Sequence, residues 1–81
     1  MKTEEQKLNI IISKNIRTAR RLREFTLKDV SKVLGITGQQ VQKYETGASV
    51  ISVSKLVILA KYFDVPITFF FEEFKINFPK G

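Results

Sequence analysis

Apolar residues recur at helical spacing along most of this 81-residue chain. The first apolar stripe, with intervals of three or four residues, predicts an amphipathic helix that ends near Glu24. Its members are Leu8, Ile12, Ile16, Ala19 and Leu22. Shorter stripes predict four more helices, the last of them a short helix that carries Phe69, Phe70 and Phe71. The pattern therefore predicts an all-α domain of five helices over residues 1–73.

Capping residues mark where several of these helices begin and end. Thr26 is a suitable N-cap for the second helix, and Asp29 three residues later completes an acidic variant of the capping box. Gly35 supplies a left-handed stop, and Thr37 can cap a third helix that runs to about Glu45. Thr46-Gly47 ends that helix, and Ser52 caps the fourth. The inward-facing residues of these three helices are expected to be Val30, Val33, Leu34, Val41, Tyr44, Leu56, Leu59, Ala60 and Phe63.

The residues after the fifth helix follow a different period. Phe74, Ile76 and Phe78 alternate with polar residues, which predicts an extended segment or a strand. Residues 74–81 are therefore expected to form a short extended C-terminal tail.

The second and third helices are joined only by Gly35-Ile36-Thr37. A turn this short forces a steep crossing, which is the geometry of a helix-turn-helix motif. Ser31 provides the small residue that a close approach of the two helices requires. The third helix is then expected to expose Gly38, Gln39, Gln40, Gln42, Lys43 and Thr46.

The composition excludes several classes of function. Cys and His are both absent, which excludes zinc fingers, thiol chemistry and imidazole catalysis. We expect neither an enzyme nor a cofactor. The N-terminus lacks the features of a signal peptide, and no run approaches the roughly 18 apolar residues of a membrane span. A soluble, cytoplasmic protein is expected.

The charge is strongly basic, with 14 Lys and Arg against 8 Asp and Glu, which suggests a polyanionic partner. Many of the cations lie close together, although such a run can also be a solvated helix face. They are Lys14, Arg17, Arg20, Arg21, Arg23, Lys28 and Lys32. Gln can pair with the major-groove edge of adenine, and Lys can donate to guanine, so the third helix is a candidate for reading DNA.

The stretch from about Ile12 to Phe71 resembles the lambda-repressor-like helix-turn-helix domain of the Cro/cI or Xre family of bacterial and phage regulators. The residues that carry the resemblance are 26–37, 39–47, Ile51-Ser52 and 56–71. The segments Gln39-Gln40-Val41-Gln42-Lys43-Tyr44-Glu45 and Phe69-Phe70-Phe71-Glu72 look especially like Xre-type regulators of alphaproteobacteria.

The resemblance implies a role for individual residues on double-stranded DNA. Base contacts are expected from Gln39, Gln40 and Lys43, and base or phosphate contacts from Gln42, Thr37 and Gly38. Phosphate contacts are expected from Arg17, Lys28, Thr46 and Ser49. Arg20 and Glu45 match a pair that ties the first helix to the recognition helix.

Four positions depart from the family pattern. Leu27 stands where the family often has Gln, so Lys28 is expected to supply that phosphate contact instead. Gly38 replaces a bulky residue, and Val50 replaces an Arg of the following loop. Glu24 lies at a helix end where the family commonly uses Gly. The first three departures predict weaker contacts around the recognition helix.

One such domain offers only three or four base-reading side chains, so a homodimer on two half-sites is expected. Apolar residues near the C-terminus are predicted to form its interface, with packing into the core as the alternative. They are Phe69, Phe71, Phe74, Ile76 and Phe78. The leading interpretation is a transcriptional regulator, a repressor by family habit. The alternatives are an antitoxin, or another protein-interaction module, with secondary DNA binding, and a peripheral membrane binder, which the scattered arginines disfavour.

Overall fold

The computed structural model describes residues 1–73, and these residues form four α-helices and one 3-10 helix, with no strand among them. The elements are α1 (Glu4–Leu22), α2 (Leu27–Leu34), α3 (Gly38–Thr46), α4 (Val53–Phe63) and η1 (Ile67–Phe71). The all-α expectation is confirmed, but the fifth element is a 3-10 helix. The predicted tail over 74–81 lies outside the described residues.

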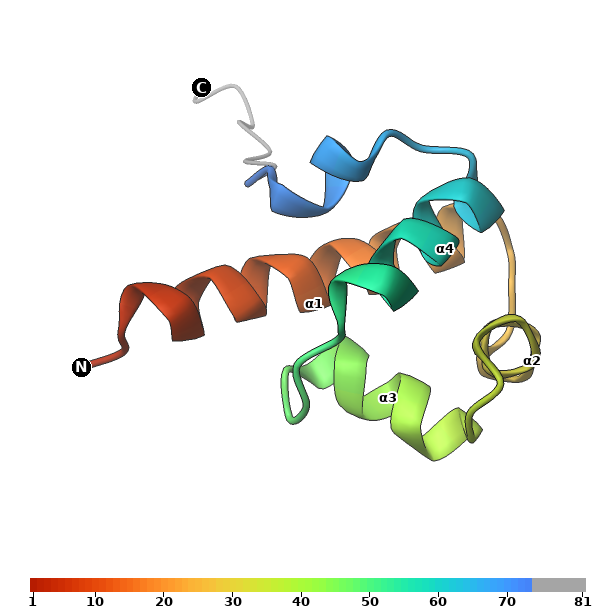
Figure 1. The fold of residues 1–81 in the computed structure, drawn as a ribbon, viewed down its shortest axis with the longest axis horizontal. Coiled ribbons are helices and arrows are strands. Elements are labelled where there is room, and N and C mark those ends of the chain that lie inside the picture. Colours follow the sequence, from red (N-terminus) through yellow and green to blue (C-terminus); the bar gives the residue numbers. More distant parts are fainter. Residues whose placement is uncertain (74–81) are drawn as a thin grey trace, which may run out of the picture.

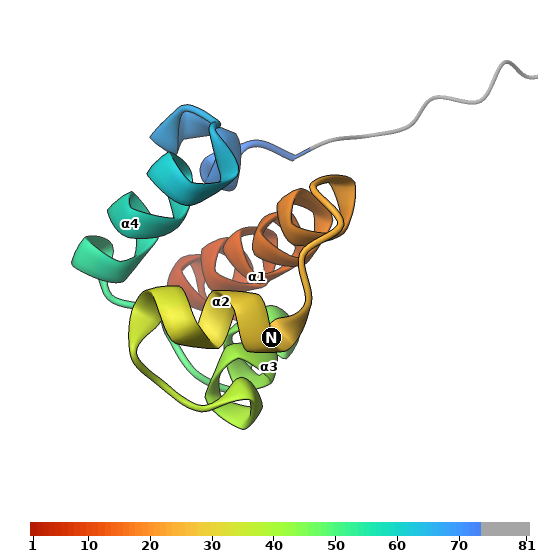
Figure 2. The same cartoon turned by 90° about the vertical axis from the view of Figure 1, so that its right-hand side faces the viewer.

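Helix α1 is the central element (Figure 1). It contacts α3 on one side and η1 on the other, while α2 packs against α3 and α4. Figure 2 shows α2 and α3 crossing steeply after the short turn between them. The first turns of α1 extend beyond the other helices, and residues 1–8 are all exposed. The arrangement leaves one face of α3 open to solvent.

The core gathers one apolar face from each helix around Phe63 and Phe70, both fully buried. The other buried apolar residues are Ile16, Ala19, Val30, Val41, Tyr44, Ile51, Leu56, Leu59 and Ala60. Three residues expected on inward faces are instead exposed: Leu8 (45%), Leu22 (71%) and Val33 (36%). Leu8 lies on the first turns of α1, which project beyond the other helices, and Leu22 is the last residue of that helix.

Two side chains, one on α1 and one on the residue that directly follows it, hold the C-terminal part of the domain. The buried Asn15 amide donates to the carbonyl oxygens of Phe69, Phe70 and Glu72 at 3.2, 2.9 and 2.7 Å. Arg23 donates through Nε to the Phe63 carbonyl oxygen at 2.7 Å, where the last carbonyls of α4 need partners. These bonds fix η1 and the end of α4 on α1.

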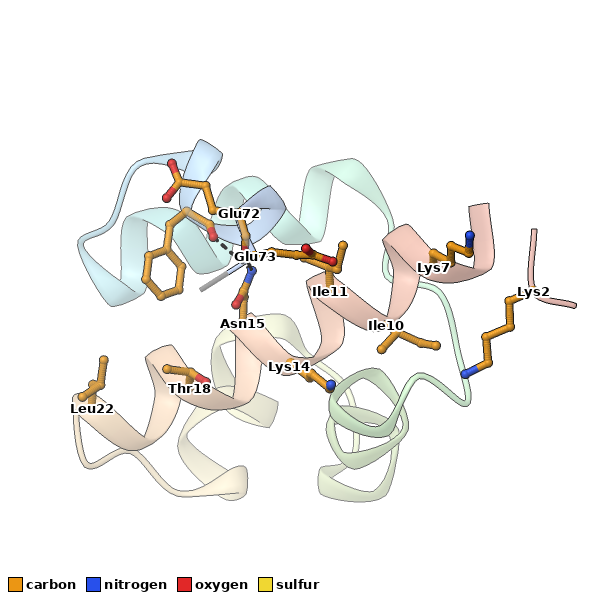
Figure 3. A pocket seen from close by; sticks show the side chains of 11 residues that line it. Lys2, Lys7, Ile10, Ile11, Lys14, Asn15, Thr18, Leu22, Glu72 and Glu73 are labelled. Atoms are coloured by element: carbon orange, nitrogen blue, oxygen red, sulfur yellow. Dashed lines mark hydrogen bonds between the residues drawn. The ribbon is translucent and has the colours of Figure 1, made fainter. Parts of the chain in front are cut away.

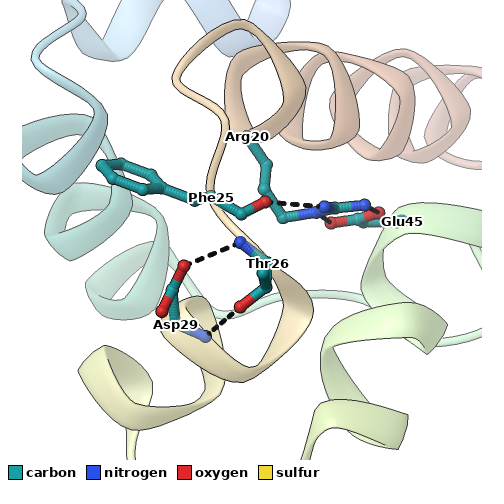
Figure 4. A network of polar contacts seen from close by, with 5 residues as sticks. All are labelled: Arg20, Phe25, Thr26, Asp29 and Glu45. Carbon is teal, nitrogen blue, oxygen red and sulfur yellow. Dashed lines mark hydrogen bonds and ion pairs between the residues drawn. The ribbon is translucent and has the colours of Figure 1, made fainter.

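The expected caps are confirmed. The Thr26 hydroxyl accepts from the Asp29 amide at 3.0 Å, and the Asp29 carboxylate accepts from the Thr26 amide at 2.8 Å (Figure 4). The backbone hydrogen bond from Thr26 holds the pKa of Asp29 below its usual value of 3.8. Gly35 and Gly47 take left-handed conformations, with φ of 67° and 83°, at the ends of α2 and α3.

Helix α1 ends at Leu22, slightly earlier than expected, and Glu24 then adopts a left-handed conformation with φ of 60°. A β-carbon is strained there and glycine is not. We expect Glu24→Gly to raise the free energy of unfolding by about 0.5–1 kcal/mol, measured by thermal denaturation. Glu24→Ala is the matched control: it removes the same charge and keeps the strain. An equal gain in both variants would attribute the effect to charge.

Among residues 1–73 no helix combines the length and the apolar character needed to cross a membrane.

Candidate nucleic-acid interface

Helix α3 separates an apolar inner face from a polar outer face. Val41, Tyr44 and Glu45 are buried, whereas Gln39, Gln42, Lys43 and Thr46 are exposed. Gln40 and Gly38 are half-buried at the first turn. The exposed side chains are those that the sequence singles out for DNA contacts, and all of them project from a single rigid helix.

The two ends of α3 are fixed by local hydrogen bonds. The Thr37 hydroxyl accepts from the Gln40 amide at 3.1 Å, so its oxygen serves as the N-cap. At the other end, the Asn9 side chain of α1 donates to the Gly47 carbonyl oxygen at 3.2 Å. The Ser49 amide donates to the Lys43 carbonyl oxygen at 3.2 Å, which leaves the Ser49 hydroxyl as the group that could reach a phosphate.

A two-point ion pair ties α3 to α1. Arg20 Nε lies 2.6 Å from Glu45 Oε2, and Arg20 Nη2 lies 3.0 Å from Glu45 Oε1 (Figure 4). Arg20 Nη1 also donates to the Phe25 carbonyl oxygen at 2.9 Å. The Arg20 side chain is only 13% exposed and the Glu45 side chain 4%. The hydrogen bonds to Glu45 raise the pKa of Arg20. Because bidentate pairs of this kind have a fixed geometry, the pair sets the orientation of α3.

A polar hollow of about 220 Å³ lies beside this pair, between α1, the start of α2 and the end of α3, and is called the Arg17–Arg21 hollow below. Its lining residues are Arg17, Arg20, Arg21, Leu27, Gln42, Glu45 and Thr46. Arg17 and Arg21, one helical turn apart, are both exposed and bring two cations to the edge of the outer face of α3. The resemblance in sequence assigns a phosphate contact to Arg17 but not to Arg21. The spacing of four residues, which places both on one face of a helix, could have indicated Arg21 as well.

The basic run thus has two parts. Arg20 and Arg23 are engaged in hydrogen bonds within the fold. The remaining cations of the run are exposed: Lys14, Arg17, Arg21, Lys28 and Lys32. Two cations of the run therefore hold the fold together, and only the exposed ones are available to a partner.

Comparison with known proteins identifies the family of the chain. The model of the helix-turn-helix family HTH_3 matches residues 16–70, more than half of the chain. The chain belongs to this helix-turn-helix (HTH) family.

Several curated relatives are uncharacterized transcriptional regulators. One, HTH-type, from Sinorhizobium medicae is 33% identical over 72 residues, which is 89% of this chain and 52% of the relative. Another HTH-type regulator, from Rickettsia conorii, is 37% identical over 67 residues, which is 83% of this chain and 54% of the relative. A regulator in the ATPase CF(0) region of Rhodospirillum rubrum is 41% identical over 64 residues, which is 79% of this chain and 56% of the relative. The chain spans about half the length of these relatives.

A solved structure confirms the HTH fold. The restriction-modification controller protein C.AhdI from Aeromonas hydrophila superimposes with a TM-score of 0.71 at 17% identity. The match covers 78% of this chain and 96% of that protein.

Three departures from the HTH pattern have clear structural settings. Leu27 is half-buried against the core and forms an apolar wall of the Arg17–Arg21 hollow. Lys28, expected to compensate for it, is exposed on the first turn of α2 but does not line the hollow. A β-carbon added at Gly38 would meet no atom within 4 Å, and Val50 is 73% exposed.

The expected dimer surface is only partly within the described residues. Phe71 is 45% exposed and Phe69 is half-buried against the core. Phe74, Ile76 and Phe78 lie outside the described residues.

Proposed function

We propose that the protein is a transcriptional regulator that binds double-stranded DNA sequence-specifically with α3 in the major groove. The observation that carries the proposal is the exposed polar face of α3, flanked by the Arg17–Arg21 hollow. Side chains on a single helix read bases, while cations at its edge contact the phosphates.

Within this proposal the outer face of α3 divides into two groups. Gln39, Gln40 and Lys43 contact bases, and Gln42, Thr37 and Gly38 lie near bases or phosphates. The phosphate contacts come from Arg17, Lys28, Thr46 and Ser49, and we add Arg21 to them. Arg21 supplies a cation beside Leu27, where the family often places a Gln. Arg20 and Glu45 act as positioning residues that fix the angle of α3.

Arg17→Ala and Arg21→Ala should each weaken binding to all duplexes and lower the salt dependence. Each phosphate contact that is lost removes about one unit from the slope of log K against log salt. Fluorescence anisotropy at several salt concentrations measures this slope. Lys61→Ala, an exposed cation on α4, is the matched control and should leave it unchanged. An Arg21 variant with the slope of the control would remove Arg21 from the interface.

The proposed regulator acts as a homodimer and represses by occluding a promoter. Three or four base-reading side chains discriminate too weakly against the competing sites of a genome, whereas two copies double the number of base contacts. The exposed Phe71 supports an apolar contact between copies near the C-terminus.

Selection of bound sequences from a random pool of duplex DNA tests the proposal. We expect enrichment of a short motif, repeated with two-fold symmetry about one helical turn apart. A pool without any enriched motif would refute sequence-specific binding, and a single unrepeated motif would refute the dimer on DNA.

A further inference from the structure

A groove of about 800 Å³ runs along α1 on the side that faces η1, away from the Arg17–Arg21 hollow. Its floor is largely apolar, formed by Ile10, Ile11, Leu22 and Phe69, and its other lining residues are polar or charged (Figure 3). These are Lys2, Lys7, Lys14, Asn15, Thr18, Glu72 and Glu73. Neither the proposed base contacts nor the proposed phosphate contacts use this groove.

The groove continues onto a part of α1 that has no partner within the described chain. The first turns of α1 project beyond the other helices, yet carry Leu8, which is 45% exposed, next to Ile10 and Ile11. At the other end of the groove Leu22 is 71% exposed. A partner that covered these apolar side chains would remove them from water, which favours association.

The two edges of the groove carry opposite charges. Lys7 and Lys14 lie along α1, and the carboxylates of Glu72 and Glu73 lie on the segment that follows η1 (Figure 3). Within residues 1–73 neither Glu72 nor Glu73 forms an ion pair, and neither does Lys14. Lys7 has only an exposed contact of 3.7 Å with Glu4, a type that contributes little to stability.

We propose that the occupant of this groove is a second copy of the same chain, bound about a two-fold axis. In a two-fold interface each surface patch meets its own copy, so the patch must be complementary to itself. A basic edge and an acidic edge on either side of an apolar floor satisfy this condition, because Lys14 of one copy then faces Glu72 of the other. The inference rests on the homodimer of the proposed function and assigns its surface to α1 as well as to η1.

Asn15 has a positioning role in this interface. Its three hydrogen bonds hold the carbonyl oxygens of Phe69, Phe70 and Glu72, and so fix the acidic edge relative to α1. The side chains of Glu72 and Lys14 are exposed and can be changed without disturbing these bonds.

Sedimentation equilibrium of charge-reversed variants of the full chain tests the proposal. The wild type should be a dimer at micromolar concentration. Lys14→Glu and Glu72→Lys should each raise the dimer dissociation constant by at least about tenfold, because each places two like-charge contacts in the interface. An equimolar mixture of the two variants should recover the dimer, since every contact in the mixed pair joins opposite charges. Lys61→Glu on α4 is the matched control and should dimerise normally.

Leu22→Glu, at the exposed end of α1, tests the apolar floor and should also produce a monomer with an unchanged circular dichroism spectrum. A monomeric wild type, a dimeric Leu22→Glu variant or a mixture that stays monomeric would each overturn the proposal. Binding of the Leu22→Glu monomer to a duplex with one selected half-site separates the two claims. If the monomer binds, DNA recognition is independent of the groove; if the wild type dimerises but binds no DNA, only the proposed function fails.

Discussion

Glu45→Ala is expected to lower the free energy of unfolding by about 3–5 kcal/mol, a large part of the stability of a small domain. The Glu45 side chain is 4% exposed and accepts two hydrogen bonds from Arg20, so its removal leaves a poorly solvated guanidinium without its counter-charge. Urea denaturation followed by circular dichroism measures the change.

Glu4→Ala is the matched control, because the Glu4 side chain is 95% exposed and its ion pair with Lys7 is weak. It should change stability by no more than about 0.5 kcal/mol. A Glu45→Ala variant as stable as this control would show that the pair does not hold α3 on α1.

Gln39→Ala and Lys43→Ala are each expected to weaken binding to the selected DNA site by about 1–3 kcal/mol. Both side chains are exposed on the outer face of α3, so their removal should cost no stability. Binding to random duplex should change much less, because base contacts carry the preference for sequence. Titration of both duplexes at one salt concentration measures the difference.

Lys61→Ala serves again as the control for the loss of one positive charge. If Lys43→Ala weakened random and selected duplexes equally, Lys43 would be a phosphate contact. Equal effects of Gln39→Ala on both duplexes would remove Gln39 from base recognition.

Local features of the fold could be predicted from the sequence. The capping box of Thr26 and Asp29 and the left-handed stops at Gly35 and Gly47 depend on residues within one turn, and the structure contains all of them. Leu8, Leu22 and Val33 were assigned wrongly to inward faces. A helical period gives the direction of a side chain, but not whether another element covers it at that point.

In the candidate site, too, the features that depend on local sequence could be predicted, and those that depend on packing between helices could not. The outer face of α3 follows from the helical period, since Val41 and Tyr44 define the buried side. The Arg20–Glu45 pair joins residues 25 positions apart, and only the resemblance to a known family indicated it. The structural role of Arg23 and the position of Arg21 at the hollow depend on how α1 packs against α4 and α3, which no local pattern specifies.

The groove on α1 also required the structure. Ile10 and Ile11 lie outside the apolar stripe that the sequence predicts for the first helix. Only the structure shows that they line a groove together with Phe69 and Glu72. The sequence suggested a dimer surface confined to the C-terminal apolar residues, whereas the proposed surface extends onto α1.

The most direct measurement of the central claim is a base-by-base comparison of wild type and Gln39→Ala. The affinity of each protein is measured for every single base-pair substitution of the selected half-site. If α3 reads the major groove, Gln39→Ala should lose its preference at one base pair, or two adjacent ones, and keep the wild-type preference elsewhere. An unchanged profile, or a uniform loss at every position, would remove Gln39 from base recognition. The same result with Lys43→Ala would contradict the assignment of α3 as the recognition helix.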